Sequence, residues 1–264
     1  MNNFKKDRNH LIKYFILNTI IFGIINALII KLSPNLFGFH FIFSFLFLIP
    51  LGPLVGLISA TAFHNASHGN IKPRILNTLV GELTASFSLE DIRCFRVGHM
   101  LHHMHVDDPE LDPHPPRGLS FIQFIATSRQ KTISCITNFY YKLHGKNKSN
   151  ELNVSSQIAI FHLAVLMKLL FWFLILGPAG FIFFYIPSYL SYFFGFAHLN
   201  YVSHLEHDGE DDNEGSIHNH NESIFYQVMN VLTSGGYFHK NHHLSPGLYN
   251  PVKLMIKIRA LIYL

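Results

Sequence analysis

Residues 98–114 read GHMLHHMHVDDPELDPH, and this short run holds five histidines and four carboxylates. On a helix, His99, His102 and His103 occupy positions i, i+3 and i+4, so their three imidazoles project from one face. A neutral imidazole nitrogen is a good ligand for iron, zinc, copper or nickel near pH 7. One such triplet can also decorate a solvated helix, so its meaning depends on the rest of the chain.

Two further histidine clusters support the metal interpretation. His64 and His68 form an HxxxH pair, and residues 239–243 read HKNHH, a second HxxHH pattern that contains His239, His242 and His243. Each cluster again places its imidazoles on one face of a helix. A zinc site closes with four ligands and would leave the other imidazoles unused, and the chain has no HExxH motif. Two metal ions with about four ligands each would use all eight imidazoles, and with iron such a site can activate dioxygen.

A ninth candidate ligand follows the last apolar run of the chain. Residues 200–204 read NYVSH, so Asn200 and His204 lie about one helical turn apart and face the same pocket. We expect His204 to be the additional ligand and Asn200 to act in the second coordination sphere or through a water molecule. His198 and His207 are weaker candidates at a similar depth.

The carboxylates of residues 107–112 admit two interpretations. Asp107, Asp108, Glu110 and Asp112 can accept hydrogen bonds from imidazole N–H groups and so orient metal ligands. Alternatively, they cap and solvate a loop. The sequence alone favours neither interpretation.

The composition indicates a membrane protein. The chain has 264 residues, of which 49% are hydrophobic and 14% are charged, against roughly 25% charged residues in soluble globular proteins. The net charge of +4 does not predict nucleic-acid binding, because the basic residues form no patch interleaved with aromatic residues. The two cysteines form neither a disulfide framework nor a CxxC motif, which is typical of a reducing compartment.

Four apolar runs predict the architecture. They cover about residues 11–30, 40–63, 154–176 and 178–200, and each can cross a hydrocarbon core of ~30 Å. We therefore expect an all-α integral membrane fold over residues 1–264, with four transmembrane helices in two hairpins. A cytoplasmic helical cap over 64–152 and 201–264 carries the histidine clusters. Within the cap, residues 75–89 and 119–141 predict interfacial helices and residues 144–151 a polar linker. Lys168 falls inside the third span, where a charge is costly and the sequence offers no obvious partner.

The basic residues predict the orientation of the spans. Eight lysines and arginines lie between residues 91 and 152, and others lie near both termini, whereas the hairpin turns hold almost none. Because cytoplasmic loops are enriched in Lys and Arg, the clusters and both termini are expected on the cytoplasmic side.

These features resemble the membrane di-iron fatty acid desaturase and hydroxylase superfamily. The resemblance rests on three histidine boxes in order, the two hairpins between them and the NxxxH step, over roughly residues 12–250. The middle box and His64-Asn65-Ala66-Ser67-His68-Gly69 look close to the bacterial carotenoid hydroxylase and ketolase branch. The closing box, which runs on to Pro246, is similar to the last box of acyl desaturases. By position, the resemblance implies two non-haem iron ions, with the following ligands: His64, His68, His99, His102, His103, His239, His242 and His243, with His204 as the extra ligand.

The resemblance implies an O2-dependent oxidoreductase that acts on C–H bonds of a long-chain lipid, most plausibly a fatty acyl desaturase. A carotenoid hydroxylase or ketolase is the alternative, and a membrane metal transporter is a distant one. The substrate would come from the membrane. The sequence shows no haem-binding domain, Rossmann glycine motif or CxxC pair. Electrons would therefore come from a separate ferredoxin or cytochrome b5-like donor. The expected location is a bacterial inner membrane or its equivalent, with the active site on the cytoplasmic side.

Overall fold

The computed structural model describes residues 2–32, 46–205 and 217–252. Within these ranges the regular structure is helical apart from one isolated β-bridge between Asn219 and Phe238. The helices are, in chain order, α1 (Asn2–Lys6), α2 (His10–Leu32), α3 (Leu48–His68), α4 (Arg74–Phe87), α5 (Ile92–Met104), α6 (Phe121–His144), α7 (Lys148–Gly180), the π-helix η2 (Phe181–Tyr185), α8 (Ile186–Ser203), α9 (Ile224–Leu232) and α10 (His239–Leu244).

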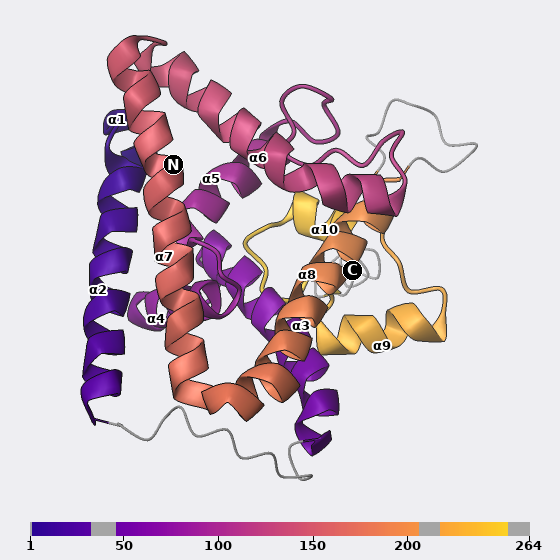
Figure 1. The fold of residues 1–264 in the computed structure, drawn as a ribbon. Coiled ribbons are helices and arrows are strands. Elements are labelled where there is room, and N and C mark those ends of the chain that lie inside the picture. Colours follow the sequence, from indigo (N-terminus) through magenta and orange to yellow (C-terminus); the bar gives the residue numbers. More distant parts are fainter. Residues whose placement is uncertain (1, 33–45, 206–216, 253–264) are drawn as a thin grey trace.

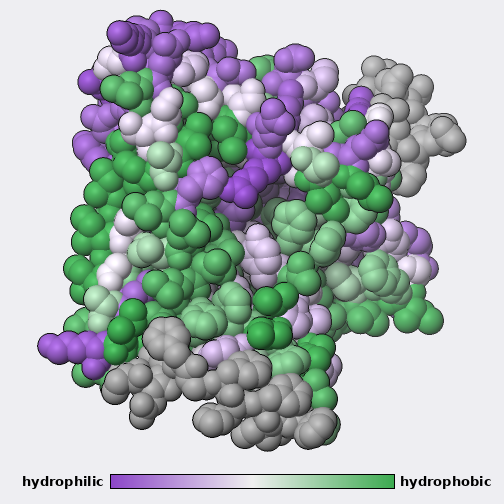
Figure 2. Space-filling model, in the orientation of Figure 1, coloured by the Kyte–Doolittle hydropathy of each residue, from purple (hydrophilic) through white to green (hydrophobic). Residues whose placement is uncertain are grey.

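Among the described residues, three helical stretches are long and apolar enough to cross a membrane. They are His10–Leu32, Leu48–His68 and Lys148–Ser203, and the last of these folds into the two arms α7 and α8. Hydrophilic residues gather at the end of the molecule that carries α1 and the α6–α7 connection, whereas hydrophobic residues cover the sides formed by α2, α7 and α9 (Figure 2). The structure thus confirms the expected all-α membrane fold. The predicted span over 40–63 is described only from residue 46 onward.

The long helices pack in pairs that the chain order does not reveal. α2 packs along α7, and α3 packs along α8, while α7 and α8 diverge from the bend that joins them (Figure 1). The bend centres on Gly177, whose φ of 66° and ψ of 171° interrupt the helix just before Pro178. A positive φ is strained for most residues but not for glycine, which explains why this arm can turn here. Each arm of the second hairpin therefore packs against a helix of the first.

A glycine sets the close approach of α3 to α8. A Cβ atom built on Gly56 would lie 2.1 Å from the backbone oxygen of Ser188, so no larger residue fits. Small residues at such crossings let two membrane helices pack backbone to backbone. The contact fixes α3 and α8, which both lead to the histidine clusters, as one rigid pair.

The helices between the spans partly match the sequence expectations. α4 buries one face, which includes Gly81 and Ala85, and exposes Ile75 and Leu79, as an interfacial or half-buried helix would. α6 begins with a capping box in which Ser120 and Gln123 satisfy each other's backbone N–H groups. The predicted linker over 144–151 is shorter than expected, because α6 continues to His144 and α7 already begins at Lys148.

Lys168 has a partner that the sequence did not suggest. Its side chain is 2% exposed, and its ammonium group donates a hydrogen bond to the backbone carbonyl of Glu90. Glu90 immediately precedes Asp91, whose carboxylate caps α5 by accepting the N–H groups of Arg93 and Cys94. Lys168 therefore ties the middle of α7 to the start of the helix that carries the central histidine box.

Candidate metal centre

The histidine clusters meet at the ends of four helices. His68 lies in the last turn of α3, His102 and His103 in the last turn of α5, and His242 and His243 in the last turn of α10. The residue that caps the C-terminus of α8 is His204. The three boxes and the NxxxH step thus come together from segments as far apart as residues 64 and 243.

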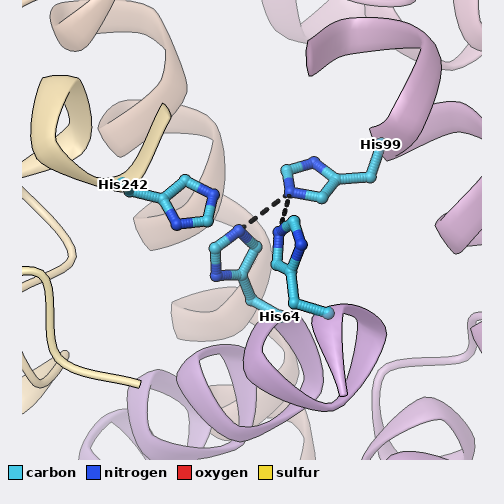
Figure 3. A group of neighbouring side chains, drawn as sticks. His64, His99 and His242 are labelled. Atoms are coloured by element: carbon cyan, nitrogen blue, oxygen red, sulfur yellow. Dashed lines mark hydrogen bonds between the residues drawn. The ribbon is translucent and has the colours of Figure 1, made fainter. Parts of the chain in front are cut away.

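The first group of imidazoles contains His64, His68, His99 and His242. One ligating nitrogen from each lies within 4.8 Å of the others. The Nε2 atom of His99 is 3.0 Å from Nε2 of His64 and 2.9 Å from Nε2 of His68. The rings of His64, His99 and His242 converge on one small space from α3, α5 and α10 (Figure 3).

The second group contains His102, His204, His239 and His243, whose ligating nitrogens also lie within 4.8 Å of one another. His102, His204 and His239 are at most 2% exposed, so this group is almost sealed from solvent. Adjacent histidines in the chain divide between the groups: His102 and His243 belong to the second group, whereas His242 belongs to the first.

His103 lies between the two groups. Its Nε2 atom is 3.1 Å from Nε2 of His99 and 3.1 Å from Nε2 of His242, both in the first group. Its ring centroid is also 4.3 Å from that of His243 in the second group. Every predicted ligand among the described residues is therefore part of one cluster of imidazoles.

Two carboxylates contact the Nδ1 atoms of imidazoles in the second group. Asp112 lies 3.0 Å from Nδ1 of His102 and also contacts His114, at 3.3 Å from its Nδ1. Asp107 lies 3.2 Å from Nδ1 of His204. Burial raises the pKa of the Asp112 carboxyl, but hydrogen bonds from His102 and His114 outweigh this effect and hold its pKa well below its usual range. Asp112 is therefore an ionised acceptor that fixes the orientation of the His102 ring.

Asp108 does not contact an imidazole of either group, although the sequence made it as good a candidate as Asp112. Its carboxylate accepts the backbone N–H groups of Glu110 and Leu111 at 2.8 Å, so it caps the loop. The physical reason is that the short side chain faces its own turn, which offers two N–H donors close by. His114 was not predicted as a neighbour of the site. Its position two residues after Asp112, in an Asp-Pro-His turn, is the signal that was available.

The remaining candidates have other contacts. Asn200 is buried and its amide donates to the carbonyl of Phe196 on its own helix at 2.9 Å. The ring of His198 is 2.8 Å from the hydroxyl of Tyr237 and belongs to neither group of four. His207 lies outside the described residues.

Side-chain hydrogen bonds hold the contributing segments together. Arg96 on α5 donates to the carbonyls of Ser67 and Ala66 at 2.7 and 3.1 Å, so it ties the central box to the end of α3. The short helix α10 is held in the same way: Asn219 exchanges two hydrogen bonds with Asn241, at 3.0 and 3.2 Å. Six-residue α10, which has little stability of its own, is thus fastened to the segment that precedes α9.

Several imidazoles of the cluster outside the spans have pKa values below the usual range for histidine. Burial lowers the pKa of His102 to about 4 and that of His103 to about 3, and neighbouring imidazoles lower the pKa of His103 further. The pKa values of His99, His239 and His242 also lie well below the usual range, again chiefly because of burial. A neutral imidazole keeps a lone pair for a metal ion.

The donor set fits iron. The Nε2 atoms of His102 and His204 are buried and have no hydrogen-bond partner among the described residues. A buried polar atom normally finds a partner, so these lone pairs directed into the cluster are consistent with ligation. All-nitrogen sites of this kind suit iron and other first-row transition metals.

A narrow apolar cavity of about 40 Å³ reaches the cluster between α3 and α8. Leu57, Ala60, Phe196 and Leu199 line it on the membrane side, and it ends at the following histidines: His64, His239 and His242. The cavity therefore borders members of both groups of imidazoles.

The fold and the site together define a helical integral membrane protein with a histidine-rich metal centre. The family model described as "Fatty acid desaturase" matches residues 39–251, and the chain therefore belongs to this family of membrane iron-dependent oxidoreductases that act on lipids. Among curated proteins, none matches the chain. The match confirms the resemblance at the level of the family, and the likeness to the carotenoid branch stays a prediction.

Proposed function

We propose that the protein is a di-iron fatty acyl desaturase. One iron ion would be held by His64, His68, His99 and His242, and the other by His102, His204, His239 and His243. The observation that carries the proposal is the division of eight imidazoles into two groups of four beside an apolar cavity. Two complete sets of donors support two metal ions better than one.

His103 is assigned as the ninth ligand in this proposal. Its Nε2 atom is close to two members of the first group, and its ring is close to His243 of the second. Its ring therefore lies within reach of members of both groups.

The overall reaction must balance two oxidations, of the acyl chain and of the external donor, against the reduction of one O2. Desaturation removes two hydrogens from neighbouring carbons of the chain, and O2 takes up these two electrons and two protons together with two more of each from an external donor, to give two water molecules. The bound iron ions would supply the oxidising power for this step, as cofactors do in difficult redox chemistry.

The protein's own side chains would orient the centre and exclude water. Asp112 and Asp107 hold the rings of His102 and His204. The ring of Phe95 stacks on His99 with centroids 5.3 Å apart, and Phe196 lies 6.0 Å from His64. An apolar wall of this kind keeps solvent away from the carbon that reacts.

The shape of the apolar cavity supports an acyl chain over a carotenoid. The cavity is narrow and lies between two helices that approach closely at Gly56. An unbranched alkyl chain is the narrower of the two candidate substrates, since the substituted end ring of a carotenoid is much wider.

The positions of lysine and arginine support a centre that faces the cytoplasm of a bacterial cell or its equivalent, where a ferredoxin or cytochrome b5-like protein would deliver electrons. The chain's desaturase family supports a redox partner of this general kind.

The test is lipid analysis of cells that express the protein, with a His242→Ala variant in parallel. We expect new double bonds in the acyl chains with the wild-type protein and none with the variant. Oxygenated carotenoids or hydroxylated acyl chains without new double bonds would show that the protein is a hydroxylase or ketolase.

A further inference from the structure

The apolar cavity is too small for the acyl chain that the proposed function requires. Its volume of about 40 Å³ has room for about three water molecules. A methylene group is roughly as large as a water molecule, so a long acyl chain needs several times this volume. One wall of the cavity must therefore move before an acyl chain can reach His64 and the other histidines that line it.

The wall between α3 and α8 is rigid. The two helices lie side by side (Figure 1), and Gly52 and Gly56 allow close backbone contact along their crossing. A Cβ atom on Gly52 would lie 2.8 Å from the backbone oxygen of Phe184, and one on Gly195 would lie 2.5 Å from the side chain of Leu57. Separation of α3 from α8 would break all of these contacts at once, so this wall is costly to open.

The turn that follows α9 forms a second wall and is tied to that helix. The N–H group of Gly236 donates to Oγ1 of Thr233 at 3.1 Å, and the N–H group of Gly235 donates to the carbonyl of Asn230 at 2.7 Å. The hydroxyl of Thr233 in turn donates to the carbonyl of Met229 at 2.7 Å. These bonds make the turn an extension of α9, so it does not open by itself.

The remaining wall is an irregular segment, residues 245–251, which we call the strap. Three of its side chains line the cavity: Leu248, Tyr249 and Pro251. Each end of the strap is anchored by one asparagine side chain. Asn70 donates to the carbonyl of Pro246 at 2.9 Å, and Asn241 donates to the carbonyl of Pro251 at 3.4 Å. The strap thus crosses the cavity between two fixed points.

The middle of the strap is held much less firmly than its ends. Among the described residues, the hydrogen bonds of 247–250 stay local: the N–H group of Leu248 donates to the carbonyl of Ser245 at 3.1 Å, and Oδ1 of Asn250 accepts the N–H group of Val252 at 3.0 Å. The side chain of Tyr249 is 43% exposed. A segment with few buried contacts and local hydrogen bonds opens at a low free energy.

We propose that the strap is the movable wall of the apolar cavity, and that Tyr249 closes the entrance through which the alkyl chain of the substrate reaches the imidazoles. The inference rests on the proposed function and adds the route by which the substrate enters. In the closed form, Leu248 and Tyr249 complete the apolar lining beside His64 and His242. Opening of the strap admits the chain, and its return excludes water, as closing loops do in many enzymes.

Gly247 gives the strap its freedom to open. It is exposed, and a Cβ atom at this position would meet nothing within 4 Å. Close packing therefore does not require a glycine here, and what glycine contributes is backbone flexibility. An alanine at this position would fit the closed form and restrict the open one.

The test measures how fast a cysteine inside the cavity reacts with N-ethylmaleimide, a small uncharged thiol reagent. The protein is the full-length, iron-loaded chain in a non-ionic detergent, and mass spectrometry of the intact protein follows the reaction. The reporter is Ala60→Cys, since Ala60 lines the cavity and is 5% exposed. Cys94 and Cys135, which are free thiols, are replaced by alanine in every protein compared.

Three substitutions are made separately in this parent protein. Tyr249→Ala removes the exposed ring at the entrance, and Gly247→Ala restricts the backbone of the strap. Phe47→Ala is the matched control, because it removes an exposed aromatic ring at the start of α3 that does not line the cavity.

We expect Tyr249→Ala to raise the rate of labelling by about tenfold, since a half-buried ring no longer holds the closed form. Gly247→Ala should lower the rate by about two- to fivefold, and Phe47→Ala should leave it unchanged. Equal rates in the parent and both strap variants, an equal increase in Phe47→Ala, or no labelling of any variant would overturn the proposal. Labelling needs no turnover, so a protein that forms no double bonds can still show this dependence on the strap.

Discussion

The two groups of imidazoles differ in what surrounds them. The first group lines the apolar cavity through His64 and His242, and the close contacts of its ring nitrogens are with other imidazoles. The second group is more deeply buried, and Asp107 and Asp112 hold two of its rings. The comparison teaches that the first group is the more open half of the centre, since the second group reaches the apolar cavity only through His239, and that the second group is the anchored half. Four experiments test this division.

The largest effect is expected when a ligand is removed from either group. His242→Ala in the first group and His102→Ala in the second should each lower the iron content from about two ions per chain to about one or fewer, because a site with three neutral imidazoles and a cavity binds metal weakly. Elemental analysis of the purified proteins measures this directly.

The control for both variants is His162→Ala, which removes an exposed imidazole on α7 that belongs to neither group. It should leave the iron content unchanged. Zinc in place of iron, or an iron content that neither ligand variant alters, would contradict the assignment of the two groups.

A smaller effect is expected when the anchor of the second group is loosened. Asp112→Asn keeps the shape of the side chain but removes the charge that orients His102, and loss of such an outer partner typically lowers metal affinity 10–100-fold. Competition with a chelator measures the affinity. Asp108→Asn is the matched control, since Asp108 caps the loop, and an equal loss in both variants would mean that the carboxylates act only on the loop.

A substitution in the open half should act on turnover and not on metal. Thr61 lines the apolar cavity beside His64. Thr61→Phe is expected to obstruct the alkyl chain and lower product formation by roughly tenfold, as misplacement of a reacting carbon does, while the iron content stays unchanged. Thr61→Val, which preserves the volume, should retain activity. Loss of iron in Thr61→Phe would show that the cavity and the first group are not separate.

The smallest effect concerns acid and the metal-free protein. Burial lowers the pKa of His102 to about 4 in the folded chain, whereas in the unfolded chain it lies near the ordinary histidine value of 6.5. Between these two pH values His102 is protonated in the unfolded chain only, and this protonation favours unfolding. Stability is therefore full above pH 6.5 and falls as the pH decreases from 6.5 towards 4. We expect the midpoint of thermal unfolding in detergent to drop by about 5 °C over this window. A midpoint that rises on acidification would show that these imidazoles are solvated.

Local spacing predicted which histidines come together, and their role as metal ligands stays a prediction. The HxxxH and HxxHH patterns place imidazoles on helical faces, and the structure brings all nine predicted histidines into one cluster. Spacing could not predict how they divide. Adjacent histidines on a helix point about 100° apart, so His242 and His243 serve different groups, and only the packing of α10 against α3 and α5 decides which.

Long-range contacts could not be predicted from the sequence either. Asp107 and Asp112 reach imidazoles, while Asp108 between them turns to its own backbone, because the path of the loop decides which carboxylates face the helices. The partner of Lys168 is a backbone carbonyl 78 residues away, and no residue type marks a carbonyl in advance. The pairing of α2 with α7 and α3 with α8 likewise depends on the bend at Gly177 and on the close contact at Gly56.

The four helices that end at the imidazoles have an electrostatic consequence. The peptide dipoles of a helix leave about half a negative elementary charge at its C-terminus. α3, α5, α8 and α10 all direct this end at the centre. Neutral imidazoles bring no counter-charge to a divalent cation, so the field of the backbone and the carboxylates of Asp107 and Asp112 provide it. Much of the affinity for metal would then come from the orientation of these four helices. It would therefore survive exchange of any single ligand for another neutral donor.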